Sequence, residues 1–311
     1  MKVGLVLPHL GTEATKDSIL KIALGAEYEG FDSLWVAERL LWPVNPQTPY
    51  PATADGSLPT FYQRVFDPLE TLTFVAGRTE KIALGTSVID MLFHTPVVLA
   101  KRFATLDQLS EGRSICGLGI GWSKDEYQAS NVPFKDRGRR ADEFVQALKK
   151  TWEDDIVEFH GQFYSIPSSK IGPKPVQKPS IPIYLGGYVP NAFARIARYA
   201  DGWLASLAGP IDFLENSIKS LNEQALKINR NPKEFKNNVL TFPQLATNSS
   251  PSSDSSNTNQ PRFPLTGTID QIGQDIMAIK DLGFEQITFA FIGLELDKVI
   301  ETAKELSRFA R

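Results

Sequence analysis

The sequence has little cysteine, little histidine and no long apolar run. Its 311 residues include a single cysteine, Cys116, so no disulfide can form within the chain. Cys116 stands in an apolar run, which predicts a buried thiol in a reducing compartment. The three histidines, His9, His94 and His160, show no spacing typical of metal ligands, and we expect no metal site.

The same sparseness bears on location and partners. No window approaches the roughly 18 uncharged apolar residues of a membrane span. The first apolar run is broken by Pro8 and is too short for the core of a secretion signal. A formal net charge of −3 gives no electrostatic reason to expect nucleic acid. We expect a cytoplasmic protein that acts on a small molecule, with no nucleic-acid or membrane partner.

Short apolar runs alternate with longer amphipathic segments along the chain. The predicted strands cover residues 2–8, 31–36, 82–87, 114–119, 181–185, 202–206, 238–245 and 284–291. The predicted helices cover residues 15–29, 68–78, 96–109, 137–152, 191–199, 212–228, 269–282 and 295–308. Eight βα units favour a closed parallel (β/α)8 TIM barrel, with catalysis at the carboxyl ends of the strands. An open doubly wound sheet is the alternative.

Two helix-to-strand joints share one stop signal. Gly30 precedes one predicted strand and Gly283 precedes another, each where glycine ends a helix in the left-handed conformation. Thr268 and Gln271 fit a capping box at the start of the helix that Gly283 ends. Because the same joint occurs near both ends, residues 1–311 are predicted to form one domain.

Three stretches are longer than ordinary connections. Residues 40–66 carry several prolines and aromatic residues, and they fit either a packed surface loop or a wall of the substrate pocket. Residues 155–182 contain a predicted hairpin at 157–164, followed by a proline-rich return. Residues 247–264 are rich in serine and asparagine, which predicts a mobile segment. The first and third follow strand ends and are expected to overhang the active-site face.

Two glycine-rich turns are candidates for a cofactor site. Residues 117–121 read G-x-G-x-G, which lacks the spacing of the dinucleotide fingerprint; the segment fits a tight turn or a backbone surface for a flat ring. Gly186 and Gly187 end a strand just before a helix that opens near Asn191. Free N–H groups at such a helix start favour phosphate, although a plain turn is the alternative.

Polar residues at other strand ends complete the candidate site. Thr86 and Ser87 place hydroxyls at the end of the third strand, where simple strand termination is the alternative. Glu38 and Arg39 follow the second strand and form either a functional acid–base pair or a local ion pair. The basic run 135–140 is either a solvated helix start or a site for an anionic cofactor tail.

Together these motifs resemble the luciferase-like monooxygenase superfamily, and within it the oxidoreductases that depend on the deazaflavin coenzyme F420. The resemblance runs along the whole chain. It is strongest in FDSLWVAER at 31–39, IALGTSV at 82–88, GLGIGW at 117–122 and PIYLGG at 182–187, with further matches at 104–113, 138–143 and 200–203. The resemblance also implies a homodimer.

The resemblance implies roles for individual positions. A deazaflavin or flavin ring would lie over the barrel mouth, propped by a strand-end bulge at Ser87–Val88 that is often a non-prolyl cis peptide. The implied cofactor-binding residues are Thr86, Ser87, Val88, Gly119, Gly121, Trp122, Gly186, Gly187 and Tyr188, the last three forming the phosphate turn. The candidate catalytic residues are Glu38, Arg39 and Trp122.

Two departures limit the chemistry that the resemblance carries. Arg39 stands where relatives often have histidine, and Trp122 stands where some sugar-phosphate-oxidising relatives have a catalytic glutamate. The leading hypothesis is hydride transfer between coenzyme F420 and a small organic substrate. An FMN-dependent monooxygenase is the second hypothesis, and a non-catalytic flavin-binding barrel is the third.

Overall fold

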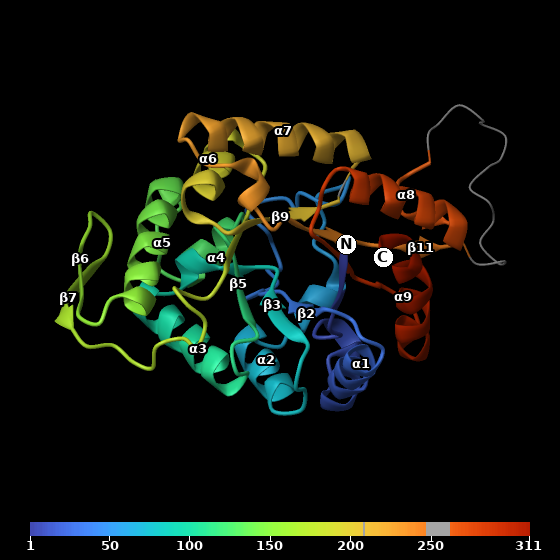
Figure 1. Ribbon diagram of the computed structural model, residues 1–311, viewed down its shortest axis with the longest axis horizontal. Helices are drawn as coiled ribbons and strands as arrows, with labels where there is room; N and C mark the ends of the chain where they lie inside the picture. Colours follow the sequence, from blue (N-terminus) through green and yellow to red (C-terminus); the bar gives the residue numbers. More distant parts are fainter. Residues whose placement is uncertain (208, 247–261) are drawn as a thin grey trace.

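Eight parallel strands close into a barrel in the computed structural model, which describes residues 1–207, 209–246 and 262–311. The barrel strands are β1 (Lys2–Val6), β2 (Ser33–Val36), β3 (Ala83–Thr86), β5 (Ser114–Gly119), β8 (Ile183–Gly186), β9 (Gly202–Ser206), β10 (Asn238–Thr241) and β13 (Gln286–Phe289). The ring closes where β1 pairs with β13 and β3 pairs with β5. This is the predicted (β/α)8 TIM barrel, and the closure excludes the open sheet (Figure 1).

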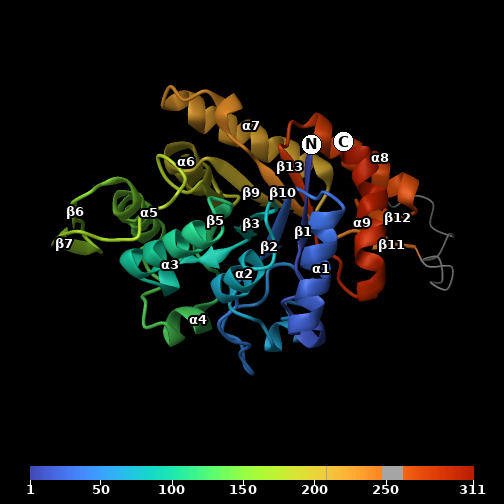
Figure 2. The ribbon, with the colours of Figure 1, turned by 60° about the horizontal axis from the view of Figure 1, so that its bottom comes forward.

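Helices surround the strands on all sides (Figures 1 and 2). They are α1 (Lys16–Tyr28), α2 (Pro68–Ala76), α3 (Pro96–Leu109), α4 (Lys124–Ala129), α5 (Arg137–Glu153), α6 (Pro190–Tyr199), α7 (Ile211–Lys227), α8 (Ile269–Asp281) and α9 (Leu296–Ala310). Short 3-10 turns are η1 (Gly11–Glu13), η2 (Thr60–Gln63), η3 (Met91–Phe93) and η4 (Pro232–Glu234). The two termini meet, since the Met1 amino group donates to the Ala310 carbonyl at 2.9 Å.

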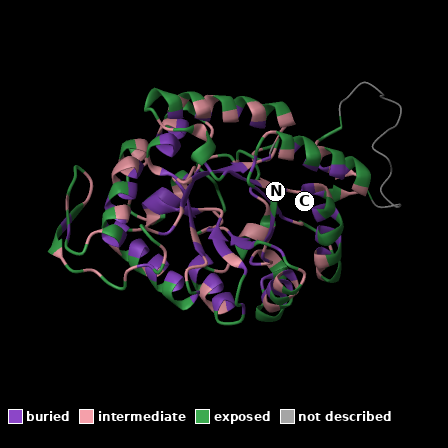
Figure 3. Ribbon diagram, viewed as in Figure 1, coloured by how far each residue is buried: buried purple, intermediate pink, exposed green. Residues whose placement is uncertain are grey.

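The apolar core follows from the period of each element. Barrel strands are buried along almost their whole length, whereas helices bury only the stripe that faces the barrel (Figure 3). Cys116 is fully buried, as predicted. The predicted helix stops are confirmed, because Gly30 and Gly283 have φ of 73° and 85°. The capping box of Thr268 and Gln271 is also present.

One predicted strand was too long. The segment 238–245 divides into β10, which ends at Thr241, and β11 (Gln244–Leu245), which leaves the barrel. β11 pairs with β12 (Thr266–Gly267) in a separate two-stranded sheet. Pro243 stands at the break, where its missing N–H cannot continue a ladder.

Other elements differ from the predicted bounds or were not predicted. The hairpin is formed by β6 (Val157–His160) and β7 (Ser165–Ser169), so its second strand begins just beyond the predicted 157–164. β4 (Ile89–Asp90) and α4 are too short to show a period, and no pattern indicated them.

The long insertions lie at different places on the barrel. Residues 40–66 follow β2 and lie against α4, where the backbone N–H of Gln47 donates to Asp125 at 3.0 Å. Most of the serine-rich insertion, residues 247–261, lies outside the described residues, so its predicted mobility stays a prediction. Within the described residues, no helix combines the length and apolar character needed to cross a bilayer. The assignment of the whole chain to one domain also stays a prediction.

Candidate active site

A bulge between β3 and β4 forms the centre of the candidate site. The Ser87–Val88 peptide is cis and non-prolyl, as the resemblance predicted. The Ser87 N–H donates to the Val36 carbonyl at 2.7 Å, and the Val88 carbonyl accepts from the Glu38 N–H at 3.0 Å. β4 then pairs with the end of β5. The bulge is therefore held on both sides at the carboxyl ends of the barrel strands.

Gly119 allows β5 to approach this bulge. A Cβ atom at position 119 would lie 2.6 Å from Cγ2 of Val88 and 2.7 Å from Oδ1 of Asp90, so any side chain there would force these neighbours to shift. Gly121 follows in the loop that leads to α4. Part of the G-x-G-x-G pattern thus has a packing reason, because Gly119 leaves room for the side chains of Val88 and Asp90.

Thr86 and Ser87 differ in what their hydroxyl groups contact. The Thr86 hydroxyl is fully buried; it donates to the Gly117 carbonyl at 2.7 Å and accepts from the Gly117 N–H at 3.0 Å. Its role is to join β3 to β5, which leaves the cofactor-binding role of its side chain an untested prediction. Ser87 lines the cavity at the barrel mouth.

The Glu38 carboxylate anchors the bulge from the β2 side. Its Oε2 accepts from the Asp90 N–H at 2.8 Å, and its Oε1 lies 2.7 Å from Nε2 of His94. The side chain is only 4 % exposed. Burial first, and the neighbouring Glu38 charge second, raise the pKa of Asp90 to about 7. Two acids and one histidine thus form a buried cluster behind the bulge.

Arg39 points into a different cluster. Its Nη1 lies 2.8 Å from Oε2 of Glu126, and both side chains are nearly inaccessible. The guanidinium carbon lies 4.9 Å from the centre of the Trp122 ring and 5.4 Å from that of Tyr62. Burial raises the pKa of Glu126, and Arg39 opposes that rise. The cluster fastens insertion 40–66 to α4.

The structure therefore separates the three predicted catalytic residues. Arg39 and Trp122 are in contact, whereas Glu38 faces Asp90 and His94. The Arg39 Nε is buried and has no hydrogen-bond partner among the described residues. None of the three lines the mouth cavity described below, so their catalytic role stays a prediction.

His9 fixes the neighbouring ends of β1 and β2. Its Nε2 accepts from the Ala37 N–H at 2.8 Å, which leaves Nδ1 to donate to the Leu7 carbonyl at 2.7 Å. Burial lowers the pKa of His9 to about 4, so the ring stays neutral. Both ring nitrogens are therefore committed to the backbone.

A cavity of about 520 Å³ opens at the barrel mouth beside Ser87. Its walls come from the ends of β1, β2, β10 and β13, together with η1 and the insertion 40–66. Tyr62 lines it and lies 3.2 Å, hydroxyl to hydroxyl, from Tyr50. Its volume falls within the ~300–1,000 Å³ typical of ligand pockets.

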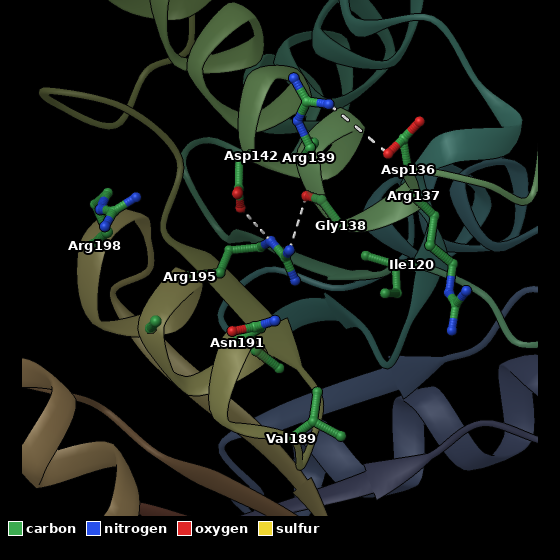
Figure 4. Close-up of a pocket in the computed structure, with 12 residues that line it drawn as sticks. Ile120, Asp136, Arg137, Gly138, Arg139, Asp142, Val189, Asn191, Arg195 and Arg198 are labelled. Atoms are coloured by element: carbon green, nitrogen blue, oxygen red, sulfur yellow. Dashed lines mark hydrogen bonds and ion pairs between the residues drawn. The ribbon is translucent and has the colours of Figure 1, made fainter.

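A second pocket, of about 500 Å³, lies where α5 and α6 begin. Four arginines and two aspartates line it: Arg137, Arg139, Arg195, Arg198, Asp136 and Asp142. Figure 4 shows Arg195 reaching from α6 to α5, where Nε lies 2.6 Å from Asp142 and Nη2 donates to the Gly138 carbonyl at 2.8 Å. Positive charge exceeds negative charge in this pocket, and the starts of both helices add to it.

The turn at 186–188 borders the arginine pocket. Gly187 has φ of 138°, and a Cβ there would lie 2.6 Å from Cβ of Ala192, so only glycine fits. Trp203 Nε1 donates to the Gly187 carbonyl at 3.0 Å, and the Tyr188 hydroxyl donates to the Ser206 carbonyl at 2.7 Å. β9 thus holds the turn in place, and no side chain caps the start of α6.

Sequence reasoning missed several residues of these clusters. Asp90, His94 and Glu126 meet their partners only through long-range contacts, which no local pattern reveals. Arg195 and Arg198 had a usable signal, since they are spaced one helical turn apart on the helix after the phosphate turn. The basic run 135–140 was a candidate anion site from the sequence alone, and two of its arginines, Arg137 and Arg139, line the pocket.

Comparison with known proteins now decides the family. The model of the luciferase-like monooxygenase family matches residues 1–252. The chain belongs to the luciferase-like monooxygenase family. This confirms the resemblance drawn from the motifs, and it makes the protein an oxidoreductase by family.

Relatives and solved structures agree with this assignment. An uncharacterised protein of Mycobacterium tuberculosis is 38 % identical over 208 residues, which cover 66 % of this chain and 72 % of the relative. An F420-dependent glucose-6-phosphate dehydrogenase of Kineococcus radiotolerans is 31 % identical over 206 residues, covering 65 % of this chain and 56 % of that relative.

Two solved structures share the fold over nearly their whole length. An F420-dependent secondary alcohol dehydrogenase in complex with an F420–acetone adduct has a TM-score of 0.80 and 19 % identity, covering 100 % of this chain and 99 % of that one. The monooxygenase RslO1 from Streptomyces bottropensis has a TM-score of 0.77 and 21 % identity, covering 100 % and 98 %. At these identities the likeness concerns the fold.

Proposed function

We propose that this oxidoreductase transfers a hydride between coenzyme F420 and a small organic substrate. One observation carries the proposal: two pockets of opposite character lie near the cis bulge at Ser87–Val88. Ser87 lines the apolar mouth cavity. Val88 packs against Gly119 and Gly186. Ile120, which follows Gly119, lines the arginine pocket. Related proteins whose names include F420 dependence support the choice of cofactor.

The residues at the bulge fit a flat ring with an anionic tail. The ring would be held by Ser87, Val88, Gly119 and Gly186, of which Gly119 lets Val88 and Asp90 pack closely against the end of β5. The tail would be held by the Gly187–Tyr188 turn and by Arg137, Arg195 and Arg198. Arg137 lies over the Phe134 ring, 4.1 Å from its centre, and neither Arg137 nor Arg198 forms an ion pair with a described residue, so no carboxylate neutralises either charge.

The chemistry divides between the cofactor and the protein. A bound deazaflavin supplies a hydride-carrying carbon and avoids most reactions with oxygen, because carbon replaces the reactive ring nitrogen of a flavin. The protein contributes orientation, since the bulge is held by backbone hydrogen bonds from β2 and by β4. The mouth cavity contributes an apolar environment that excludes water.

Carbonyl reduction also needs a proton at oxygen. The Tyr62 side chain lines the mouth cavity, and burial raises the pKa of its phenol, so it keeps its proton at neutral pH. Arg39 is paired with Glu126 and does not line that cavity. We therefore propose that Tyr62 holds the proton nearest the substrate, and that Arg39 and Trp122 position the insertion on which Tyr62 stands.

An FMN-dependent monooxygenase is the second candidate. It is favoured by the similar fold of the monooxygenase RslO1. FMN carries one phosphate, which the turn at Gly187 and the start of α6 would satisfy without Arg137 and Arg198. The extent of the arginine pocket therefore favours the cofactor with the longer anionic tail.

Turnover under anaerobic conditions tests the proposal. Reduced F420 is mixed with the protein and a panel of ketones and enones, and its oxidation is followed by absorbance. We expect oxidation that requires both protein and substrate, and deuterium transfer from labelled cofactor to product. Turnover only with reduced FMN and oxygen would contradict the proposal. Inertness with both cofactors across the panel would favour a flavin-binding barrel without catalysis.

A further inference from the structure

The walls of the mouth cavity are mostly apolar. Three phenylalanines reach it from three different connections: Phe61 from the insertion 40–66, Phe242 after β10 and Phe291 after β13. The rest of the lining is largely aliphatic and includes Val36, Leu240 and Ile292. Such walls stabilise a bound molecule in proportion to the apolar surface that they remove from water.

The charged residues among the described lining of this cavity have one sign. The described residues that line it include no lysine or arginine, and two carboxylates, Glu13 and Glu295, stand at its exposed edge. Lys298 offsets Glu295, with its Nζ 2.8 Å from the carboxylate, whereas Glu13 forms no ion pair with a described residue. His9 adds no positive charge, because both ring nitrogens bond the backbone and the ring stays neutral.

We propose that the mouth cavity takes an uncharged substrate with an apolar body, a ketone or aldehyde or the corresponding alcohol, and rejects anionic substrates. The reaction class rests on the proposed function, whereas the preference for an uncharged molecule rests on the cavity walls alone. A phosphate or carboxylate in this cavity would lose its hydration and gain no cationic partner among the described lining residues.

The arginine pocket sharpens this inference. On the same barrel, arginines of α6 and of the start of α5 line the second pocket, while the described lining of the mouth cavity has none. The protein therefore keeps its anion-binding groups away from the substrate end. A sugar phosphate is the substrate named for the glucose-6-phosphate dehydrogenase relative. Such an anion would find no cationic partner among the described residues that line the mouth cavity.

Three matched ketones test the preference. All are linear methyl ketones of equal length, and the far end carries a methyl, a hydroxyl or a carboxylate group. Their binding to the cofactor-free protein is measured by saturation-transfer NMR and calorimetry. We expect the methyl-ended ketone to bind at least about tenfold more tightly than the carboxylate, with the hydroxyl compound between them. Equal affinities, or no binding of the methyl-ended ketone, would overturn the inference.

A charge added at the cavity edge provides the second readout. Ile292 lines the cavity and is 60 % exposed, so Ile292→Lys should leave the fold intact. We expect this variant to bind the carboxylate ketone several-fold more tightly, with a gain that salt reduces. Ile156, equally exposed but outside the cavity, supplies the control Ile156→Lys, which should change nothing. An equal gain in both variants would refute a local effect.

The design separates this inference from the proposed function. The ketone affinities are measured without cofactor, and F420 affinity is measured by itself. Failure to bind F420 would contradict the proposed function and leave the ketone preference measurable. Tight F420 binding with no preference among the ketones would contradict only the inference on substrate class.

Discussion

At the scale of single residues, the buried acids behind the bulge give the site its pH dependence. Asp90 is nearly inaccessible, and burial together with the Glu38 and Glu126 charges raises its pKa to about 7. In the unfolded chain it would ionise near its ordinary value of 3.8. Between these values the folded state binds the extra proton, so stability falls as pH rises.

Replacing Asp90 with asparagine should remove this loss. Asparagine keeps an acceptor for the Gly121 N–H and does not ionise. We expect the wild-type free energy of unfolding, relative to that of Asp90→Asn, to fall between about pH 4 and 7 by at most about 1.4 kcal/mol per pH unit, and to level off above that. Denaturant titrations of both proteins at a series of pH values measure this difference in the free energy of unfolding. Because His9 titrates in both proteins, its effect cancels. Parallel pH profiles would show that Asp90 is ionised throughout.

Residue identity was easier to predict than residue contact. Glu38, Arg39 and Ser87 were found because each stands at the end of a strand, which is a local property. The partners His94, Asp90 and Glu126 come from other βα units, and only the closed barrel brings them near. A sequence read one segment at a time therefore predicts which residues follow the strand ends and misses which of them pair or line the cavity.

At the scale of elements, the turn between β8 and α6 joins the barrel to the arginine pocket. Its geometry depends on Gly187, whose φ of 138° and close approach to Ala192 exclude a side chain. Because the turn sets the start of α6, a change there should displace the backbone N–H groups that we propose hold the cofactor tail.

Gly187→Ala should weaken binding of F420 and destabilise the fold. We expect a loss of stability of roughly 1–3 kcal/mol and a loss of F420 affinity of about tenfold or more. Gly30→Ala is the control, since Gly30 also has positive φ, at 73°, but a Cβ there would meet nothing within 4 Å. The Gly30→Ala variant should lose some stability and keep its F420 affinity, as measured by fluorescence titration. A Gly187 variant with unchanged affinity would exclude this turn from the cofactor site.

Element prediction succeeded where local signals repeat. The glycines at 30 and 283 and the capping box at 268–271 fixed helix ends to within a residue or two, because these stops act through the local backbone. β4 and β11 were missed or merged, since strands of two residues have no period and exist through their partners on β5 and β12. The Pro243 break was readable in principle from its missing N–H.

At the scale of the whole molecule, the barrel arranges opposite chemical environments around one bulge. The mouth cavity is apolar and edged with carboxylates, and the second pocket is lined by arginines of α6 and of the start of α5. Sequence periodicity predicted the barrel, because eight βα units leave few alternatives. It did not predict this division, which depends on side chains from both halves of the chain. A cytoplasmic homodimer stays a prediction.

The affinity of the protein for F420 relative to FMN tests the proposed function most directly. Both are measured by equilibrium titration at one ionic strength, in the wild type and in the double variant Arg137→Gln/Arg198→Gln. We predict that the wild type binds F420 at least about tenfold more tightly than FMN, and that the double variant loses most of this preference at unchanged thermal stability. Tighter binding of FMN, or an F420 affinity that the two arginines do not affect, would contradict it.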